Sequence, residues 1–109
     1  MILKIDSTKP QEIVVELFDK KTGKRKKLTQ RQKLGSQVLL PLVVKILKEN
    51  KLTFSSLTEI RVNPGPGSFT GTRVGVAIAN ALGFALRIPV NGKKGKIAEP
   101  IYEKSKFDR

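Results

Sequence analysis

The stretch from Pro64 to Val76, which reads PGPGSFTGTRVGV, constrains the fold of this chain more than any other segment. Glycine is used where the backbone needs a positive φ or where a neighbour comes too close for a Cβ, and proline stiffens the residues beside it. Ser68 offers a side-chain oxygen to the free N–H groups of a following helix, so it is the expected N-cap. The segment therefore predicts a tight turn into a helix, with Gly65, Gly67, Ser68 and Gly71 as its turn residues.

A glycine-rich turn that opens a helix is also a common form of phosphate site, because free N–H groups and the helix dipole both favour an anion. The spacing here does not match either standard phosphate motif. Glycines stand at positions 65, 67, 71 and 75, and no Lys followed by Ser or Thr closes the loop. Spacing alone therefore favours a structural turn over an anion site.

Hydrophobic patterning divides the chain into five strands and two helices. Apolar, β-branched segments predict strands at residues 1–6 and 12–18, and Gly23 marks a hairpin turn into a charged strand at 26–30 that suits a sheet edge. Two more strands are expected, at 57–62 and 88–91. The order βββαβαβ predicts an α/β (α+β) fold with a five-stranded mixed sheet and two main helices.

The first helix is expected within residues 33–50, where apolar residues recur with the helical period. Pro41 interrupts this pattern. Either the helix kinks at Pro41, or the strongest part of the helix begins there. Two adjoining apolar rows make a stripe that is wider than one sheet contact requires. Leu39, Val43 and Leu47 therefore belong either to the core or to a contact with a partner.

The second helix is expected at residues 70–87. Its larger apolar side chains follow the helical period and are predicted to face the sheet: Val74, Ile78, Ala81, Leu82 and Ala85. Gly71, Gly75, Ala79 and Gly83 recur every fourth residue and form a row without side-chain bulk. Glycine inside a helix costs about 0.5–1 kcal/mol relative to alanine, so this row indicates close approach of another backbone. That backbone belongs either to the first helix of this chain or to another subunit.

Positive charge is concentrated in two segments. The chain has 22 Lys and Arg against 9 Asp and Glu, a net charge of +13, and the basic residues gather at 20–33 and at 93–109. Such clusters attract phosphate backbone, which makes Lys24, Arg25, Lys26 and Lys27 candidate RNA contacts, or else they are solvated turns that give solubility. No aromatic residue interleaves the cluster at 20–33, so base stacking is not expected there, and sequence-specific DNA reading is not expected either.

The amino-acid composition argues against most catalytic chemistry. The chain has no Cys and no His, which removes the commonest nucleophiles, general bases and transition-metal ligands. No apolar run is long enough to cross a bilayer, and the lack of Cys suits a reducing compartment. We therefore expect a soluble cytoplasmic protein with no catalytic residue, cofactor or metal site and no membrane partner.

Several segments resemble the TsaB (YeaZ) proteins, which act in the threonylcarbamoyladenosine (t6A) modification of tRNA. PGPGSFTGTRVGVA, followed by a small-residue helix and Ile88-Pro89-Val90, is similar to the signature of that family. The opening Ile2–Thr8 resembles its first strand and Asp-Thr-Ser turn, with Ser and Thr in swapped order. Leu39-Leu40-Pro41-Leu42 resembles its first helix, without the His that usually precedes it. The resemblance covers residues 1–92, which corresponds to the first of two lobes in ordinary members.

The domain limits expected from this resemblance are a single lobe at residues 1–92 and a basic tail at 93–109. Ala98–Tyr102 resembles the segment with which longer members end. The tail is therefore expected to dock on the lobe, in a chain that is a truncated relative of the family.

The resemblance implies the ribonuclease H-like half of the actin and sugar-kinase (ASKHA) class. It also implies a non-catalytic scaffold that packs its helices against a TsaD-like catalytic partner or against a second copy of itself, as a homodimer. By resemblance the contact surface comprises Leu39, Val43, Leu47, Gly75, Ala79 and Gly83. One lobe builds only half of a nucleotide cleft, so Asp6 is expected to cap its own turn. The alternative is a small basic RNA-binding module that uses residues 20–33, and direct tRNA contact stays open.

Overall fold

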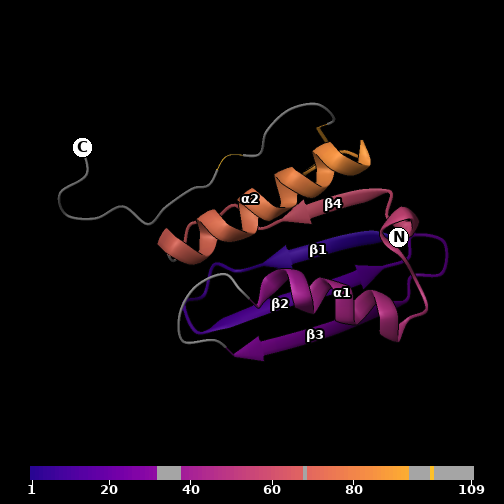
Figure 1. The fold of residues 1–109 in the computed structure, drawn as a ribbon, viewed down its shortest axis with the longest axis horizontal. Helices are drawn as coiled ribbons and strands as arrows, with labels where there is room; N and C mark the ends of the chain where they lie inside the picture. Colours follow the sequence, from indigo (N-terminus) through magenta and orange to yellow (C-terminus); the bar gives the residue numbers. More distant parts are fainter. Residues whose placement is uncertain (32–37, 68, 94–98, 100–109) are drawn as a thin grey trace.

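A four-stranded mixed sheet carries two helices on one face (Figure 1). The computed structural model describes residues 1–31, 38–67, 69–93 and 99. The strand order is β3-β2-β1-β4, in which β1 pairs antiparallel with β2 and parallel with β4, and β2 pairs antiparallel with β3. The elements are β1 (Ile2–Asp6), β2 (Glu12–Phe18), β3 (Arg25–Arg31), α1 (Leu39–Glu49), the 3₁₀ turn η1 (Phe54–Ser56), β4 (Glu59–Val62) and α2 (Phe69–Leu86).

Strict alternation of side chains gives the sheet an apolar inner face and a polar outer face. Leu3 lies opposite Leu17 and Ile60, and all three are buried under the helices. One residue further along β1, Lys4 lies opposite Glu16 and points to the outer face. Because side chains in a strand alternate with period two, these registers fix which face is packed and which meets solvent.

Helix α1 covers β2 and β3, and both of its apolar rows are buried against the sheet: Leu39, Leu42, Val43, Ile46 and Leu47. Pro41 is the third residue of α1, inside the first turn, where the missing N–H has no intrahelical partner to lose. The helix therefore starts at this point of the sequence instead of kinking there. Positions 33–37 of the predicted helix lie outside the described residues.

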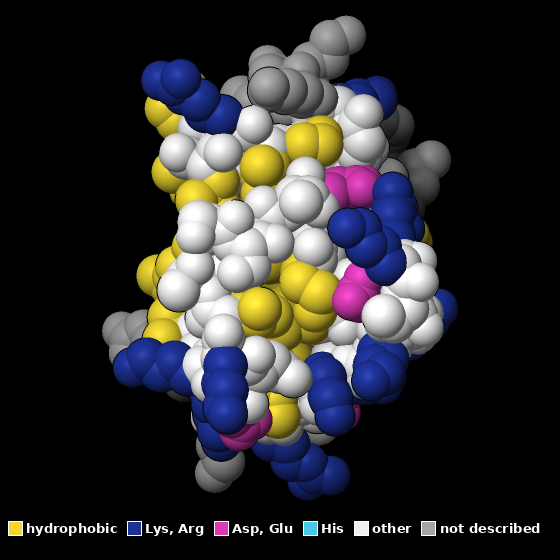
Figure 2. Space-filling model, turned by 90° about the vertical axis from the view of Figure 1, so that its right-hand side faces the viewer, with side chains coloured by type: hydrophobic (Ala, Val, Ile, Leu, Met, Phe, Trp, Pro, Cys, Tyr) yellow, Lys and Arg dark blue, Asp and Glu magenta, His cyan; other side chains and the backbone are white. Residues whose placement is uncertain are grey.

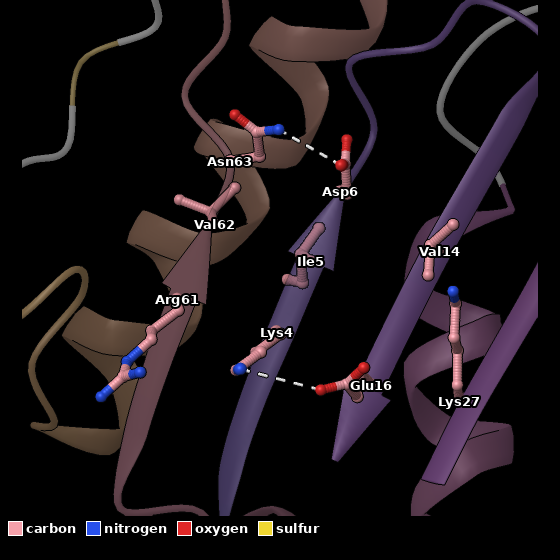
Figure 3. A pocket seen from close by; sticks show the side chains of 9 residues that line it. All are labelled: Lys4, Ile5, Asp6, Val14, Glu16, Lys27, Arg61, Val62 and Asn63. Atoms are coloured by element: carbon pink, nitrogen blue, oxygen red, sulfur yellow. Dashed lines mark hydrogen bonds and ion pairs between the residues drawn. The ribbon is translucent and has the colours of Figure 1, made fainter. Parts of the chain in front are cut away.

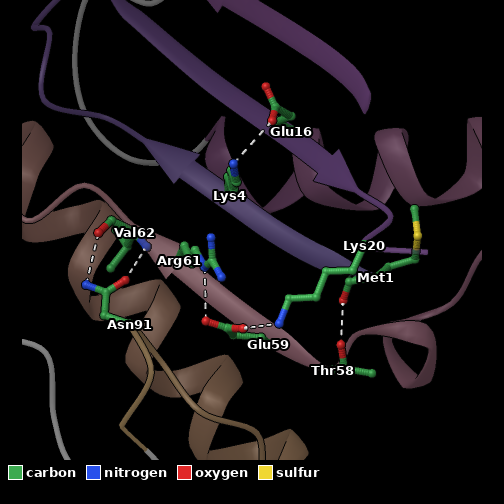
Figure 4. Close-up of polar contacts among 9 residues, drawn as sticks. All are labelled: Met1, Lys4, Glu16, Lys20, Thr58, Glu59, Arg61, Val62 and Asn91. Atoms are coloured by element: carbon green, nitrogen blue, oxygen red, sulfur yellow. Dashed lines mark hydrogen bonds and ion pairs between the residues drawn. The ribbon is translucent and has the colours of Figure 1, made fainter. Parts of the chain in front are cut away.

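The fifth strand expected at residues 88–91 is not formed, and this part of the fold prediction was wrong. Val90 makes only isolated bridges, one parallel to Ile60 and one antiparallel to Lys93, and Asn91 N donates to Ile60 O at 2.8 Å. Beyond it the Asn91 side chain takes the place of a strand, because its amide bonds both Val62 N (2.8 Å) and Val62 O (3.0 Å) (Figure 4). Positive φ angles at Asn91 (53°) and Gly92 (80°) then turn the chain away.

Helix α2 lies along β4 and β1 with its glycine row facing the sheet, which corrects the predicted orientation. A Cβ on Gly75 would collide with Ser7 Oγ, and one on Gly83 would collide with Val90 Cγ2. Ala79, between the two glycines, is fully buried. The close neighbours of the row are therefore the sheet and its flanking turns in this same chain, and neither the first helix nor another subunit is needed to explain it.

Only part of the apolar row of α2 that was predicted to face the sheet packs against the core. Ala81 and Ala85 are exposed, while Val74, Ile78 and Leu82 are half-buried at the edges of the core. A row without side chains lets the helix backbone approach the strands more closely than a row of large residues would. The orientation of α2 is therefore determined by how closely its backbone packs on the sheet, and not by the usual rule that the bulkier apolar face of a helix is buried.

We expect Gly75→Ala to destabilise the fold by about 1–3 kcal/mol, the usual cost of overpacking a core. This runs against intrinsic propensity, since alanine is the better helix former by about 0.5–1 kcal/mol. The new Cβ would displace Ser7 Oγ, which is buried and donates to Gly71 O at 2.6 Å. Urea unfolding monitored by circular dichroism measures the effect.

The matched control is the same substitution in a Ser7→Ala background. Removing the hydroxyl makes room for the Cβ, so Gly75→Ala should cost clearly less there. An equal loss in both backgrounds would contradict the proposed contact.

Candidate functional site

The turn that follows β1 is organised around the carboxylate of Asp6. Asp6 Oδ1 accepts hydrogen bonds from Thr8 N (3.0 Å) and Thr8 Oγ1 (2.7 Å), and Oδ2 accepts one from Asn63 Nδ2 (3.2 Å) (Figure 3). Asn63 Oδ1 in turn accepts from Gly65 N at 3.1 Å. Asp6 therefore caps its own turn, as predicted, and also ties the end of β1 to the glycine-rich loop after β4.

The glycines of that loop are used for close packing on the β1 turn. Gly65 has a φ of 108°, which other residues rarely adopt. A Cβ on Gly67 would lie 2.7 Å from Thr8 O, and Gly71 O receives the hydrogen bond from Ser7 Oγ. Ser68 lies outside the described residues, so its N-cap role stays a prediction. These contacts explain why glycine occupies these positions of the turn, and they support the structural interpretation that the glycine spacing favoured.

The hydrogen bonds at this turn also change the acidity of Asp6. Partial burial of the carboxylate acts to raise its pKa, but the bonds from Thr8 and Asn63, helped by the charge of Lys9, outweigh this and lower the pKa below its ordinary value. Asp6 is therefore ionised at neutral pH and held in place by fixed donors. A carboxylate in this state serves as a structural anchor for the loop.

A shallow hollow of about 390 Å³ lies on the outer face of the sheet, next to this turn (Figure 3). Charged side chains from all four strands meet there: Lys27, Glu16, Lys4, Arg61 and Asp6, with Asn63 at the end of β4. Lys4 Nζ lies 3.7 Å from Glu16 Oε1, and Arg61 pairs with Glu59 at 3.0 Å (Figure 4). Lys27 makes no ion pair with any described residue. The described residues hold no group of His, Cys, Asp or Glu that could bind a metal ion.

The residues predicted as a partner interface do not form an accessible surface. Leu39, Val43, Leu47 and Ala79 are at most 2% exposed, and Gly75 and Gly83 press against the chain's own residues. The prediction placed the interface on the faces of the two helices that pack on the sheet. A helix-pair interface itself stays a prediction, but it requires other residues.

The opposite side of α2 exposes apolar side chains. We call this surface the α2 stripe and define it by Ala77, Ala81, Phe84 and Ala85, which recur at helical spacing along the exposed side. Phe84 is 90% exposed, and among the described residues only it and Leu40 are large hydrophobic side chains left exposed. Figure 2 shows hydrophobic side chains along one edge of the view and in its centre, with the acidic side chains lying beside Lys and Arg. A lone Phe in a helix of small residues was the sequence signal for this surface.

The four candidate RNA contacts lie together at the start of β3 and its preceding turn. Lys24, Arg25, Lys26 and Lys27 are all exposed on the strand that forms one edge of the sheet. Arg25 lies 4.0 Å from Glu16 Oε1 and 4.9 Å from the centre of the Phe18 ring. The four cations therefore lie close together in the structure. Arg25, however, already contacts Glu16 and Phe18 of the same chain.

Comparison with known proteins identifies the family. The family model described as TsaD, tRNA N6-adenosine threonylcarbamoyltransferase, matches residues 27–92. The chain is 39% identical over 54 residues to the TsaB protein of Buchnera aphidicola subsp. Schizaphis graminum and 37% identical over 59 residues to that of Haemophilus influenzae. This chain belongs to the TsaB/YeaZ branch of that family. YeaZ from Pseudomonas aeruginosa has a similar solved structure, with a TM-score of 0.75 and 31% identity.

The match to these TsaB/YeaZ proteins is partial in length. The aligned segments cover 50% of this chain and 26% of the Buchnera protein, and 54% and 25% for the Haemophilus protein. The superposition with YeaZ covers 82% of this chain and 42% of YeaZ. Within its described residues the chain has no helix that is both long and apolar enough to cross a membrane.

Two alanines on opposite sides of α2 test its orientation. We expect Ala79→Leu to destabilise the fold by about 1–3 kcal/mol, because the larger side chain must enter a filled core. Ala81→Leu, on the exposed α2 stripe, should change stability by less than about 0.5 kcal/mol. Thermal and urea unfolding compare the two variants. Equal stability of both variants would show that α2 is rotated relative to this description.

Proposed function

We propose that this chain is a non-catalytic subunit of the t6A modification machinery, which binds a TsaD-like catalytic protein through its α2 stripe. The observation that carries the proposal is Phe84, a 90% exposed aromatic side chain within an apolar helix face of a TsaB/YeaZ family member. A large exposed apolar side chain that lies within a contiguous apolar stripe is typical of protein interaction sites. Single exposed apolar residues scattered over a surface would not indicate an interaction site.

The choice of partner rests on the family comparison. The TsaD family model matches residues 27–92, a range that contains both α1 and α2. A TsaD-like protein therefore carries counterparts of these helices, and two related helices can pack side by side with small residues at their contact. A second copy of this chain offers the same helices, so a homodimer competes for the same surface.

The residues of the chain support a scaffold more than an enzyme. Cys and His are missing from the whole sequence, and both oxygens of Asp6 are engaged by donors from this chain. The likeness to YeaZ and the helix-covered sheet support the ribonuclease H-like half of the actin and sugar-kinase class. Half of such a fold supplies one wall of a nucleotide cleft. A role in tRNA modification favours a cytoplasmic location.

The test is co-purification of the tagged chain with the TsaD-like protein of the same organism. Phe84→Ser and Ala81→Glu should each abolish association, because one removes the central apolar contact and the other buries a charge in it. Gln30→Glu, an equal added charge on the exposed edge strand β3, is the control and should associate like the parent chain. Circular dichroism should show all three variants folded.

The stripe assignment fails if Phe84→Ser and Ala81→Glu bind the TsaD-like protein as well as the parent chain does. Size-exclusion chromatography of the chain alone distinguishes the two partners. A dimer that both substitutions convert to monomer, in a chain that never binds the TsaD-like protein, would replace the proposed partner with a second copy.

A further inference from the structure

The β2–β3 hairpin carries a concentration of positive charge that the helix-mediated association does not use. Residues 20–31 contain seven basic residues and no acidic one. Two of them are paired within the chain, Lys20 with Glu59 at 3.9 Å and Arg25 with Glu16 at 4.0 Å. The other five are exposed and make no ion pair with any described residue: Lys21, Lys24, Lys26, Lys27 and Arg31.

The position of β3 presents these cations in a regular array. β3 is an edge strand that pairs only with β2, so its other edge faces solvent. Arg25, Lys27 and Arg31 lie on the outer face of the sheet, opposite Phe18, Glu16 and Glu12, while Lys26 lies on the other face. Positions two residues apart in a strand are about 7 Å apart. Lys27 also borders the hollow on the outer face, where Lys4 is paired with Glu16, so the free positive charge is concentrated at the β3 edge (Figure 3).

Electrostatics determines which kind of partner this edge can accept. Antiparallel pairing with the same strand of a second copy would bring basic side chains against basic side chains, which is unfavourable. The charge of this edge therefore favours a partner that carries several negative charges. Phe18 is the aromatic residue beside the cluster, and its ring already has Lys4 at 5.0 Å and Arg25 at 4.9 Å. Binding would consequently use charge without base stacking.

We propose that the β2–β3 hairpin binds the phosphate groups of RNA through Lys24, Lys26, Lys27 and Arg31, without reading base sequence. The choice of RNA over an acidic protein rests on the proposed function, which places this chain in a tRNA-modifying complex. Lysine and arginine side chains that neutralise phosphates release counterions, so the contact is strongly salt-dependent. The site lies along the free edge of the sheet, at β3 and its preceding turn, on the far side of the sheet order from α2 and β4, so RNA and protein partner can bind together.

The experiment measures fluorescence anisotropy of a labelled tRNA transcript with the 109-residue chain between about 50 and 200 mM salt. Four phosphate contacts predict a slope of log affinity against log salt of about −3. The double variant Lys26→Gln/Lys27→Gln should reduce the slope by about 1.5 and weaken binding about tenfold or more at low salt. Lys45→Gln/Lys48→Gln removes the same charge from the exposed side of α1 and should bind like the parent chain.

Three results would overturn this proposal. The first is that tRNA does not bind even at the lowest salt, and the second is that the hairpin and α1 variants weaken binding equally. The third is that a poly-glutamate peptide binds as tightly as tRNA, which would indicate an acidic protein partner. The outcome is independent of the association test. The hairpin variant should still co-purify with the TsaD-like protein, and Phe84→Ser should still bind tRNA.

Discussion

Contact between the glycine row of α2 and the turn after β1 determines the arrangement of the rest of this structure. Gly75 leaves just enough space for Ser7, whose buried hydroxyl bonds Gly71 O at 2.6 Å. The same turn carries Asp6, which accepts a hydrogen bond from Asn63, and Thr8, which leaves no room for a side chain at Gly67. One small region therefore fixes the end of β1, the loop after β4 and the first turns of α2.

One consequence of this arrangement is that α2 buries Val76 in the core but leaves Phe84 90% exposed. A helix that approaches the sheet through glycine and alanine must turn its other side toward solvent, and Phe84 and Ala81 lie on that side. The interaction that stabilises the fold thus also creates the α2 stripe. The outer face of the sheet is different in kind, because alternation places Lys4, Glu16 and Arg61 there. The two proposed binding surfaces are therefore chemically distinct.

Much of the fold follows from local sequence patterns, and the errors have physical causes. Alternation predicts β2 at its observed limits, and the Asp6 turn follows from side-chain chemistry. The orientation of α2 could not be obtained from hydrophobicity, because close backbone packing outweighs the size of the apolar residues. The fifth strand fails because Asn91 adopts a positive φ and completes β4 with its side chain. The predicted interface residues of α1 and α2 are buried within the chain, so a helix-pair interface stays a prediction that requires other residues.

The central claim is that the side of α2 facing away from the sheet is the partner-binding surface. Methyl NMR of the chain labelled at alanine tests it residue by residue during titration with the TsaD-like protein. We expect the methyl signals of Ala77, Ala81 and Ala85 to shift or broaden, whereas that of the buried Ala79 should move little. Unchanged signals at the three exposed alanines in a formed complex would contradict it.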